Sequence, residues 1–281
     1  MKKIYIFNKS GEKEVFSPRK IYEGIKRAGA PKSLARNITE QIKKKAFEGI
    51  TTREIFDEAK RILFQEKPVA GMKFSLKEAI RKLGPSGFPF EKYIGDIFES
   101  LGFFVQLNQH IGGRCVFHEI DFLALKQRQL LIGECKYHYL AGSRVELKVA
   151  LAVYARFLDI KNGSFLRKKS LKNFRPRPML VTNTKFTSET IKYAGCIKVD
   201  LLGWRYPLDH GLEYLIESEK LYPVTVLPSC DSRFLNILSQ EGLMLAKEIL
   251  SLDHLKLSKT FDLEKESVLQ LKKEAQALLS S

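Results

Sequence analysis

The 281-residue sequence has few cysteines and no long apolar run. Its four cysteines stand 20, 61 and 34 positions apart and form no CxxC pair, which argues against a zinc ribbon and a disulfide framework. No apolar run approaches the roughly 18 to 20 residues that span a bilayer, and the first residues, MKKIYIFNKSGEKE, become polar too early for a signal peptide. We therefore expect reduced thiols in a soluble, cytoplasmic protein without a membrane partner.

Acidic side chains are scarce relative to basic ones. Lysine and arginine total 48 against 32 aspartates and glutamates, a net charge of +16. Counted along the chain, residues 1–84 hold 21 basic and 10 acidic side chains, residues 85–180 hold 15 and 8, and residues 181–281 hold 12 and 14. Such an excess favours a polyanionic partner, either nucleic acid or an anionic membrane surface, and the basicity belongs to the first two thirds of the chain.

Residues 1–85 are typical of a small domain made of one hairpin and several helices. Two short alternating segments flank a turn at residues 9–11 and predict the hairpin. Helical spacing of apolar residues follows, with Ser17 before the first helix, Thr51 or Thr52 before the third, and a further helix over roughly 70–83. The run GPSGFP then places two glycines and two prolines within six residues, which marks a domain boundary.

Residues 86–203 predict an α/β domain. The stretch FEKYIGDIFESLGF predicts a helix, and the segments FFVQL, CVFHEIDFLAL and QLLIGECKYH predict strands, the last two joined by a turn at KQRQ. A helix over about 144–160, a strand at PMLVTN, a helix over 187–195 and a strand at CIKVDLLG complete the pattern. We expect a mixed sheet flanked by helices, followed over residues 204–281 by a helical region that serves packing or dimerisation.

Three ionisable residues stand on the two strands of the predicted hairpin. Asp121 lies on one strand and Glu134 on its partner, so the two carboxylates can lie side by side and share a hard cation. Lys136 shares the face of Glu134, where an ammonium group can orient water and stabilise charge on a reacting phosphate. The alternative is an ordinary salt bridge between Glu134 and Lys136 on an exposed face, with Asp121 merely ending a strand.

The sequence around these three residues resembles a known family. The stretches FEKYIGDIFESLGF and HEIDFLALKQRQLLIGECKYH are similar to the Mrr-type restriction endonuclease and Holliday-junction-resolvase branch of the PD-(D/E)XK nucleases. The resemblance implies that Asp121, Glu134 and Lys136 are catalytic and that the two carboxylates bind Mg or Mn. It also implies a third metal ligand in Glu91, although a glutamate in the first turn of a helix also complements the helix dipole.

Histidines and a basic fragment offer further phosphate contacts. His118 and His138 flank the predicted strand site, where each either touches the phosphate or the attacking water, or makes a structural hydrogen bond. The fragment RKKSLKNFRPRP, residues 167–178, brings six basic side chains into one predicted loop. Such a loop suits either non-specific contacts with DNA phosphates or plain solvation.

A second resemblance covers residues 3–85. The stretches IYIFNKSGEKEVFSPRKIYEGIKRAG, FEGITTREIFDEA and KFSLKEAIRKLGP are similar to the ATP-cone, the regulatory nucleotide-binding domain of ribonucleotide reductases. The resemblance implies a site for ATP or dATP at Lys9, Glu14, Phe16, Lys20, Ile21 and Thr52. Asn8 stands where the family usually has a second basic residue beside Lys9, which removes one phosphate contact. The alternative is a rigid or dimerising module without a ligand.

The two resemblances combine into one prediction. We expect a Mg-dependent DNA endonuclease that is regulated by ATP or dATP at the N-terminal cone, with the nucleotide as effector because no Walker-type glycine loop is present. Cleavage of both DNA strands needs two active sites and predicts a homodimer. The alternative is a nucleotide-sensing, DNA-binding regulator that does not cut. The length argues against a ribonucleotide reductase subunit, because 281 residues lack room for its barrel.

Overall fold

The computed structural model describes residues 4–8, 11–84, 88–253 and 263–281, so part of the predicted hairpin turn, residues 9 and 10, lies outside them. The chain divides into two compact units. The N-terminal unit comprises residues 1–79, 225–232 and 249–281, and the sheet unit comprises residues 80–224 and 233–248. The chain after residue 203 therefore contributes to both units. The domain boundaries expected at residues 85 and 203 remain predictions.

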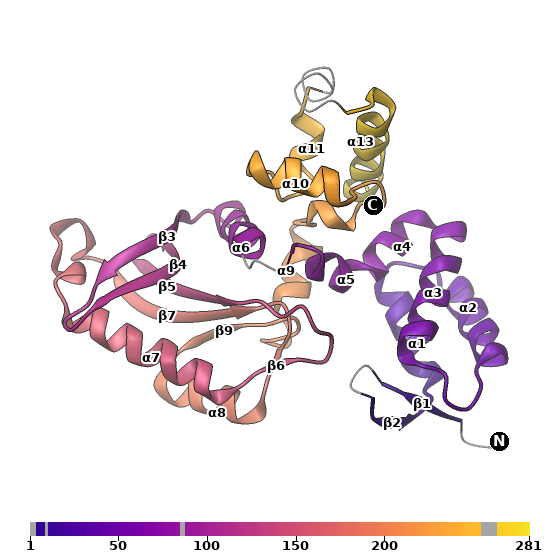
Figure 1. Cartoon of the computed structure of the whole chain (residues 1–281), viewed down its shortest axis with the longest axis horizontal. Helices are drawn as coiled ribbons and strands as arrows, with labels where there is room; N and C mark the ends of the chain where they lie inside the picture. The colour runs from indigo at the N-terminus through magenta and orange to yellow at the C-terminus, as the bar shows by residue number, and fades with distance from the viewer. Residues whose placement is uncertain (1–3, 9–10, 85–87, 254–262) are drawn as a thin grey trace. The chain divides into compact units, whose positions relative to one another are not determined.

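The N-terminal unit combines a two-stranded antiparallel hairpin with a set of helices (Figure 1). Its elements are β1 (Tyr5–Phe7), β2 (Lys13–Val15), α1 (Pro18–Arg27), α2 (Lys32–Lys45), α3 (Thr52–Glu66), α4 (Pro68–Phe74), α5 (Leu76–Arg81, which continues into the sheet unit) and α13 (Lys265–Leu279). The predicted hairpin and the first three predicted helices are confirmed. The single helix predicted over 70–83 is wrong, because Ser75 separates α4 from α5. Its hydroxyl donates to the Gly71 carbonyl at 2.9 Å and competes with the backbone for that acceptor.

Thr51 is the residue that begins α3. Its hydroxyl accepts a hydrogen bond from the Glu54 backbone N–H at 3.1 Å, and the Glu54 carboxylate accepts one from the Thr51 N–H at 2.8 Å. This reciprocal capping box satisfies two backbone donors that a helix start leaves open. The choice between Thr51 and Thr52 is thereby settled in favour of Thr51.

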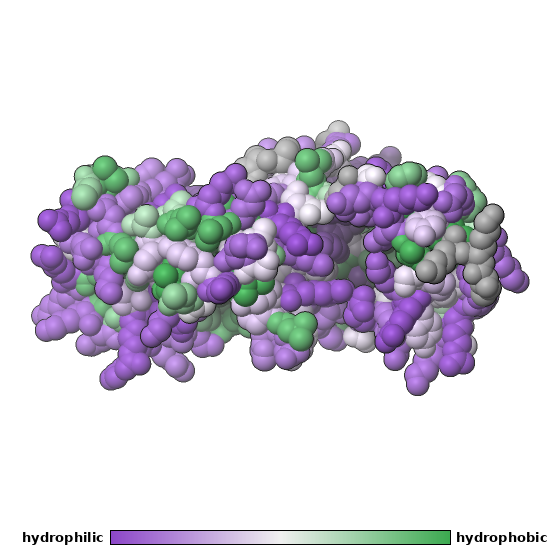
Figure 2. All heavy atoms as spheres, turned by 90° about the horizontal axis from the view of Figure 1, so that it is seen from below, coloured by the Kyte–Doolittle hydropathy of each residue, from purple (hydrophilic) through white to green (hydrophobic). Residues whose placement is uncertain are grey.

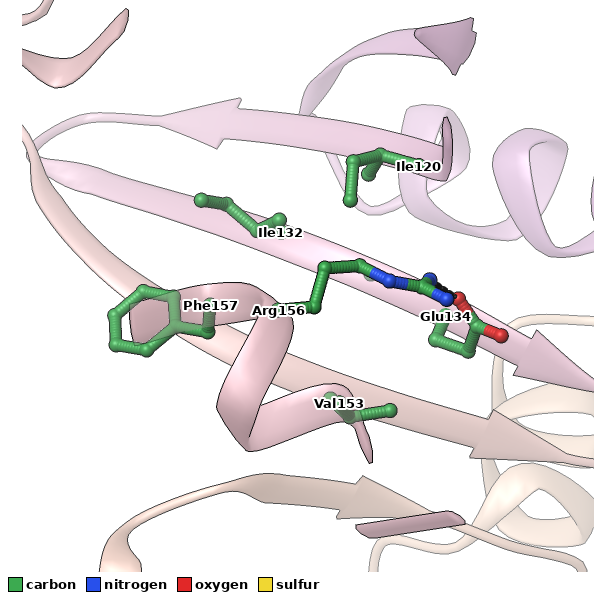
Figure 3. A pocket seen from close by; sticks show the side chains of 7 residues that line it. Ile120, Ile132, Glu134, Val153, Arg156 and Phe157 are labelled. Carbon is green, nitrogen blue, oxygen red and sulfur yellow. Dashed lines mark hydrogen bonds and ion pairs between the residues drawn. The ribbon is translucent and has the colours of Figure 1, made fainter. Parts of the chain in front are cut away.

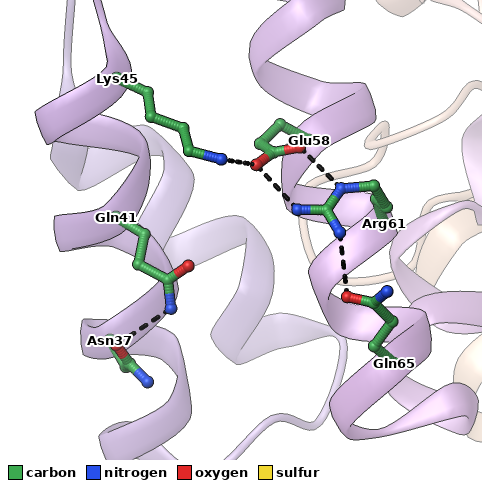
Figure 4. A network of polar contacts seen from close by, with 6 residues as sticks. All are labelled: Asn37, Gln41, Lys45, Glu58, Arg61 and Gln65. Carbon is green, nitrogen blue, oxygen red and sulfur yellow. Dashed lines mark hydrogen bonds and ion pairs between the residues drawn. The ribbon is translucent and has the colours of Figure 1, made fainter.

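A polar network joins the exposed sides of α2 and α3 (Figure 4). Arg61 donates to the Glu58 carboxylate at 2.9 and 3.0 Å, and Lys45 donates to it at 2.5 Å. Hydrogen bonds from Arg61 and Lys45 lower the pKa of Glu58 to about 2. The network therefore links two helices of the N-terminal unit through charges that remain in contact with water.

The sheet unit alternates helices and strands. Its elements are α6 (Phe88–Ser100), β3 (Phe104–Gly112), β4 (Phe117–Lys126), β5 (Gln129–Lys136), β6 (Arg144–Val145), α7 (Leu147–Asn162), η1 (Phe165–Arg167), η2 (Lys169–Leu171), β7 (Arg175–Thr182), β8 (Lys185–Phe186), α8 (Ser188–Ile197), β9 (Asp200–Leu202) and α9 (Leu212–Ser218). Three short elements, η3 (Val224–Val226), α10 (Ser232–Gln240) and α11 (Glu248–Ser251), cross between the units.

Five strands form one mixed sheet in the order β3-β4-β5-β7-β9. The ladders between β3, β4 and β5 are antiparallel, and those between β5, β7 and β9 are parallel. Helices α7 and α8 lie along one face, and α6 lies on the other (Figure 1). This is the predicted mixed sheet flanked by helices. The sequence does not predict the parallel pair β6 and β8, because two-residue strands carry no readable period.

Gly133 is required on β5 by the neighbouring strand. A Cβ atom at this position would stand 2.0 Å from the ring of Phe122, the cross-strand partner of Gly133. That ring stacks on Phe98 of α6, with centroids 5.2 Å apart. The α6 face of the sheet is thus closely packed and apolar immediately before Glu134.

The basic fragment over residues 167–178 differs from the predicted loop. Arg167 ends the helical turn η1, Lys169–Leu171 form the turn η2, and Arg175 and Arg177 stand on β7. Arg175 pairs in register with Gln129, the first residue of β5, whereas Lys136 is the last. The fragment therefore lies at the opposite end of β5 from the predicted catalytic lysine. The loop prediction was wrong because the start of the strand, RPRPML, contains two prolines. It therefore lacks the alternation of apolar and polar residues by which a strand is recognised in a sequence.

The described part of residues 204–281 is largely helical, as predicted. Helix α13 buries one side, whose members are Val268, Leu271, Ala275 and Leu278. Within the N-terminal unit, the Thr225 hydroxyl donates to the Ala79 carbonyl at 2.7 Å, and the Ser229 hydroxyl donates to Glu274 at 2.7 Å. Segments far apart in sequence thus join through buried and half-buried polar contacts.

Hydrophilic residues cover most of the face seen in Figure 2, with apolar residues in scattered small patches. Across the described ranges, no helix is long and apolar enough to cross a bilayer. All four cysteines are free, as expected, and Cys135 alone is buried.

Candidate active site on the sheet

Asp121 lies on β4 where the pairing of the sheet is interrupted. Its neighbours Ile120 and Phe122 pair with β3, whereas Asp121 does not. The residue of β3 opposite it, Asn108, has a φ of 51°, in the left-handed region that asparagine tolerates better than most residues. The Cys135 backbone N–H donates to Oδ2 of Asp121 at 2.6 Å. The carboxylate is therefore directed at β5, beside Glu134, instead of following the regular pleat.

Glu134 lies on β5 and faces α7 (Figure 3). Its Oε2 forms an ion pair with Arg156 of α7, and the same guanidinium donates to the Glu119 carbonyl at 3.3 Å. A small hollow beside this pair is lined mostly by apolar side chains, among them Ile132 and Phe157. The glutamate and arginine are each only partly exposed, so water screens their charges incompletely.

Glu91 joins these two carboxylates from the first turn of α6. Burial, followed by the charges of Asp121, Glu134 and Glu119, raises the pKa of Glu91 to about 7. Burial also raises the pKa of Asp121 and Glu134, against the opposing effect of Arg156. We call Glu91, Asp121 and Glu134 the carboxylate cluster. Its members come from three elements and repel one another, which is unfavourable unless a proton or a cation is shared.

Lys136 stands at the exposed end of β5, two residues beyond Glu134. Its charge lowers the pKa of both Asp121 and Glu134, so the ammonium group lies within electrostatic reach of each. No direct ion pair joins Lys136 to Glu134 in the described chain; the partner of Glu134 is Arg156. The alternative, an ordinary salt bridge between Glu134 and Lys136, is therefore wrong.

Carboxylate oxygens of this kind fit a hard divalent cation such as Mg or Mn. In the described ranges no three His, Cys, Asp or Glu side chains are arranged to hold a metal ion as they stand. Two existing contacts also occupy carboxylate oxygens of the cluster. Oε2 of Glu134 is held by Arg156, and Oδ2 of Asp121 is held by Cys135. A cation would be bound by the remaining oxygens or by displacing Arg156.

The two histidines have different surroundings. His118 shares a hydrogen bond with Asp159 of α7, with Nε2 and Oδ2 2.8 Å apart, and Asp159 also accepts from the Cys115 backbone. This favours the structural alternative for His118. The backbone of His138 is bonded twice to Asn183, and its Nε2 is buried without a hydrogen-bond partner among the residues described.

The residues predicted to bind nucleotide lie on the hairpin and at the starts of α1 and α3. Lys20 of α1 forms an ion pair with Glu14 of β2 at 3.3 Å, and Ile21 is buried in the core of the unit. Thr52 is the first residue of α3, and its neighbour Thr51 bridges to β1. Lys9 lies outside the described residues.

Sequence reasoning missed Arg156 and Glu119. Arg156 stands 22 positions after Glu134, on a helix that meets β5 only through tertiary packing. Glu119 precedes Asp121 by two residues, and its charge raises the pKa of Asp121. Glu119 stands in the run HEID, residues 118–121. This spacing was the sequence signal for a second acidic residue beside Asp121.

Comparisons with known proteins place the chain among relatives without a stated activity. Residues 222–279 match a family model described as AF1548-like, C-terminal. An uncharacterized protein of Archaeoglobus fulgidus is 37% identical over 155 residues, which cover 55% of this chain and 82% of that protein. A crystal structure of AF1548, described as a protein of unknown function, is similar with a TM-score of 0.57 and 33% identity, over 68% of this chain and 97% of that one.

Proposed function

Because the chain belongs to the AF1548-like family, whose relatives above carry no stated activity, we propose a function from the site itself: a metal-dependent endonuclease that hydrolyses phosphodiester bonds of DNA. One observation carries this proposal. Three partly buried carboxylates with raised pKa values lie within electrostatic reach of one another, near a lysine at one end of a mixed sheet. Perturbed ionisable groups of this kind are typical of functional sites, and the excess of basic residues suits a polyanionic substrate.

The residues divide the work of hydrolysis. In the reaction, a water oxygen bonds to phosphorus, the bond from phosphorus to the departing sugar oxygen breaks, and the departing oxygen gains a proton. Asp121, Glu134 and Glu91 would hold Mg or Mn, which supplies charge neutralisation and a lowered pKa of bound water. Lys136 orients the attacking water and offsets negative charge that develops on the phosphate. Arg156 holds Glu134 in place.

We also propose that ATP or dATP acts as an effector at the N-terminal unit. The support is the grouping of Glu14, Lys20, Ile21 and Thr52 on adjoining elements, together with the ATP-cone resemblance. Phosphate binding would release Lys20 from Glu14. An effector changes activity only through different affinities for two states of the protein, so calorimetric ATP binding that is weakened by Lys20→Ala and unchanged by Lys26→Ala tests this part.

The decisive experiment is cleavage of supercoiled and linear DNA with Mg or Mn. We expect Asp121→Asn and Lys136→Ala each to lose at least about 100-fold in rate while remaining folded. The matched control for the aspartate is Asp200→Asn, because Asp200 is also half-buried on the sheet but is paired with Arg177. Lys192→Ala on α8 is the control for the lysine. Equal activity in Asp121→Asn and wild type would contradict the proposal.

A second candidate function is a nucleotide-sensing, DNA-binding regulator that does not cut. The ion pair between Arg156 and Glu134 favours it, because an arginine already neutralises one carboxylate of the cluster. The same experiment separates the two functions. DNA binding that changes with ATP, without cleavage under any metal, would support the regulator and exclude the endonuclease.

A further inference from the structure

The segment that follows Lys136 carries two exposed apolar side chains. Tyr139 is 66% exposed and Leu140 is 71% exposed. They stand three and four residues beyond Lys136, in the connection from β5 to β6. Single exposed apolar residues are ordinary on a protein surface, but an exposed tyrosine at the rim of a candidate active site offers an aromatic face to a ligand.

The base of this segment is held by specific contacts. The side-chain amide of Asn183 accepts from the His138 N–H and donates to the His138 carbonyl, both at 2.9 Å. The hydroxyl of Tyr137 donates to the Arg81 carbonyl at 2.6 Å. The two residues before Tyr139 are therefore held in place by hydrogen bonds. Little backbone freedom is lost when the Tyr139 ring binds a ligand.

The segment is connected to the carboxylate cluster through aromatic contacts. The ring of Tyr137 packs against Phe90, with centroids 5.7 Å apart, and Phe90 immediately precedes Glu91. Tyr139 stands only two residues beyond Tyr137, in the same connection after β5. The exposed tyrosine thus lies on the same edge of the sheet as the cluster.

Two cations stand side by side just beyond this segment. Arg144 of β6 and Lys185 of β8 are register partners, and both are exposed. Neither has an acidic partner in the described chain, and the nearby Glu146 is paired with Lys148 at 3.0 Å. Like charges opposite each other on paired strands repel. An anionic ligand would relieve this repulsion, which gives the edge a preference for phosphate.

We propose that Tyr139 stacks on an unpaired base of a DNA strand whose phosphates contact Arg144 and Lys185. A base inside a duplex has no free face, so the platform selects DNA with a single-stranded segment next to the bond that is cut. This inference rests on the proposed function and names its substrate class. The ligand is a single strand because the exposed ring of Tyr139 can stack on a base while Arg144 and Lys185 attract the phosphates.

The test is the affinity of labelled DNA, measured by fluorescence anisotropy in EDTA so that no strand is cut. The probes are a 20-nucleotide single strand, a blunt duplex, and the same duplex with a ten-nucleotide overhang. We expect Tyr139→Ala to weaken binding of the first and third about tenfold, in line with the loss of one stacked base. Binding of the blunt duplex should change less than twofold.

The variant Tyr139→Phe keeps the ring and should restore wild-type affinity, whereas Tyr139→Leu should not. Tyr214→Ala, which removes another exposed tyrosine of the sheet unit, should leave all three affinities unchanged. The double variant Arg144→Ala, Lys185→Ala should weaken every probe and flatten the salt dependence. Equal losses for blunt and overhang DNA in Tyr139→Ala would overturn the stacking proposal.

A base analogue gives a direct readout of stacking. The fluorescence of 2-aminopurine in the single strand should fall on binding to wild type and fall less with Tyr139→Ala. If these results hold but no DNA is cut, the endonuclease fails and the single-strand platform stands. If DNA is cut and Tyr139→Ala behaves as wild type on every probe, the platform fails and the endonuclease stands. If wild type binds none of the probes, both are overturned.

Discussion

Two glutamates of this protein are each paired with an arginine, yet their pKa values move in opposite directions. The Glu58 side chain in the N-terminal unit is 24% exposed, nearly the same as 23% for Glu134, and hydrogen bonds from Arg61 and Lys45 lower its pKa to about 2. Burial and the charge of Asp121 raise the pKa of Glu134 in the sheet unit, although Arg156 opposes both. The arginine alone does not determine the protonation of a carboxylate: a second cation helps to lower the pKa of Glu58, whereas desolvation and a neighbouring carboxylate raise that of Glu134. The sheet cluster therefore contains carboxylates that repel one another, whereas the helix network balances one carboxylate with two cations.

The largest expected difference between the two sites concerns their arginines. Arg156→Ala should destabilise the sheet unit by about 2 kcal/mol at pH 7, because a partly buried carboxylate loses its partner. Arg61→Ala should cost the N-terminal unit no more than about 1 kcal/mol, because the Arg61 side chain is 52% exposed and Lys45 still pairs with Glu58. Hydrogen exchange in increasing denaturant measures local opening in each unit separately. Equal losses in the two variants would break the comparison.

Divalent cations should act on one site and not the other. At ten times the dissociation constant, Mg or Mn should stabilise the sheet unit by about 1.4 kcal/mol, because the cation neutralises the carboxylate cluster. The Glu58 network should not respond, since its charge is already balanced by Arg61 and Lys45. Thermal unfolding with and without metal measures the shift. A shift that persists in Asp121→Asn would place the cation elsewhere.

The carboxylate cluster should give stability an unusual pH slope in metal-free buffer. Glu91 holds its proton up to about pH 7 in the folded chain, against 4.5 as its ordinary value. The folded state then binds more protons than the unfolded state between these values, so stability falls as the pH rises from 4.5 to 7. Glu91→Gln should only reduce this fall, because Asp121 and Glu134 also have raised pKa values and contribute to it, whereas Glu99→Gln, exposed on the same helix, should leave it unchanged. Melting temperatures across this range decide the outcome.

The helix network should show the smallest effect and the opposite slope. The pKa of Glu58 is lowered to about 2 from 4.5, so its contribution is complete above pH 4.5 and is lost as the pH falls through about 2. Glu58→Gln should flatten this acid-side loss. Addition of 1 M salt should weaken it as well, because the charges are screened within roughly 3 Å. An acid-side slope that survives both changes must come from other carboxylates.

Much of the sheet unit was predictable because its strands are short, apolar and separated by clear turn residues. The proximity of Asp121 and Glu134 followed from the prediction that they stand on the two paired strands of one hairpin. Arg156 could not be predicted, because its contact depends on how α7 packs against β5. The helix break at Ser75 and the left-handed backbone conformation of Asn108 could not be predicted either. Serine and asparagine permit these conformations but do not require them.

The division of the chain into discontinuous units has a consequence for cutting and grafting it. The backbone passes from one unit to the other after residues 79, 224, 232 and 248. A single nick in any connection leaves the two units tied by the remaining three. Residues 1–79 expressed alone would lack α13 and the segment that bonds to Ala79, so the portable form of the N-terminal unit must include pieces of sequence more than 140 positions apart.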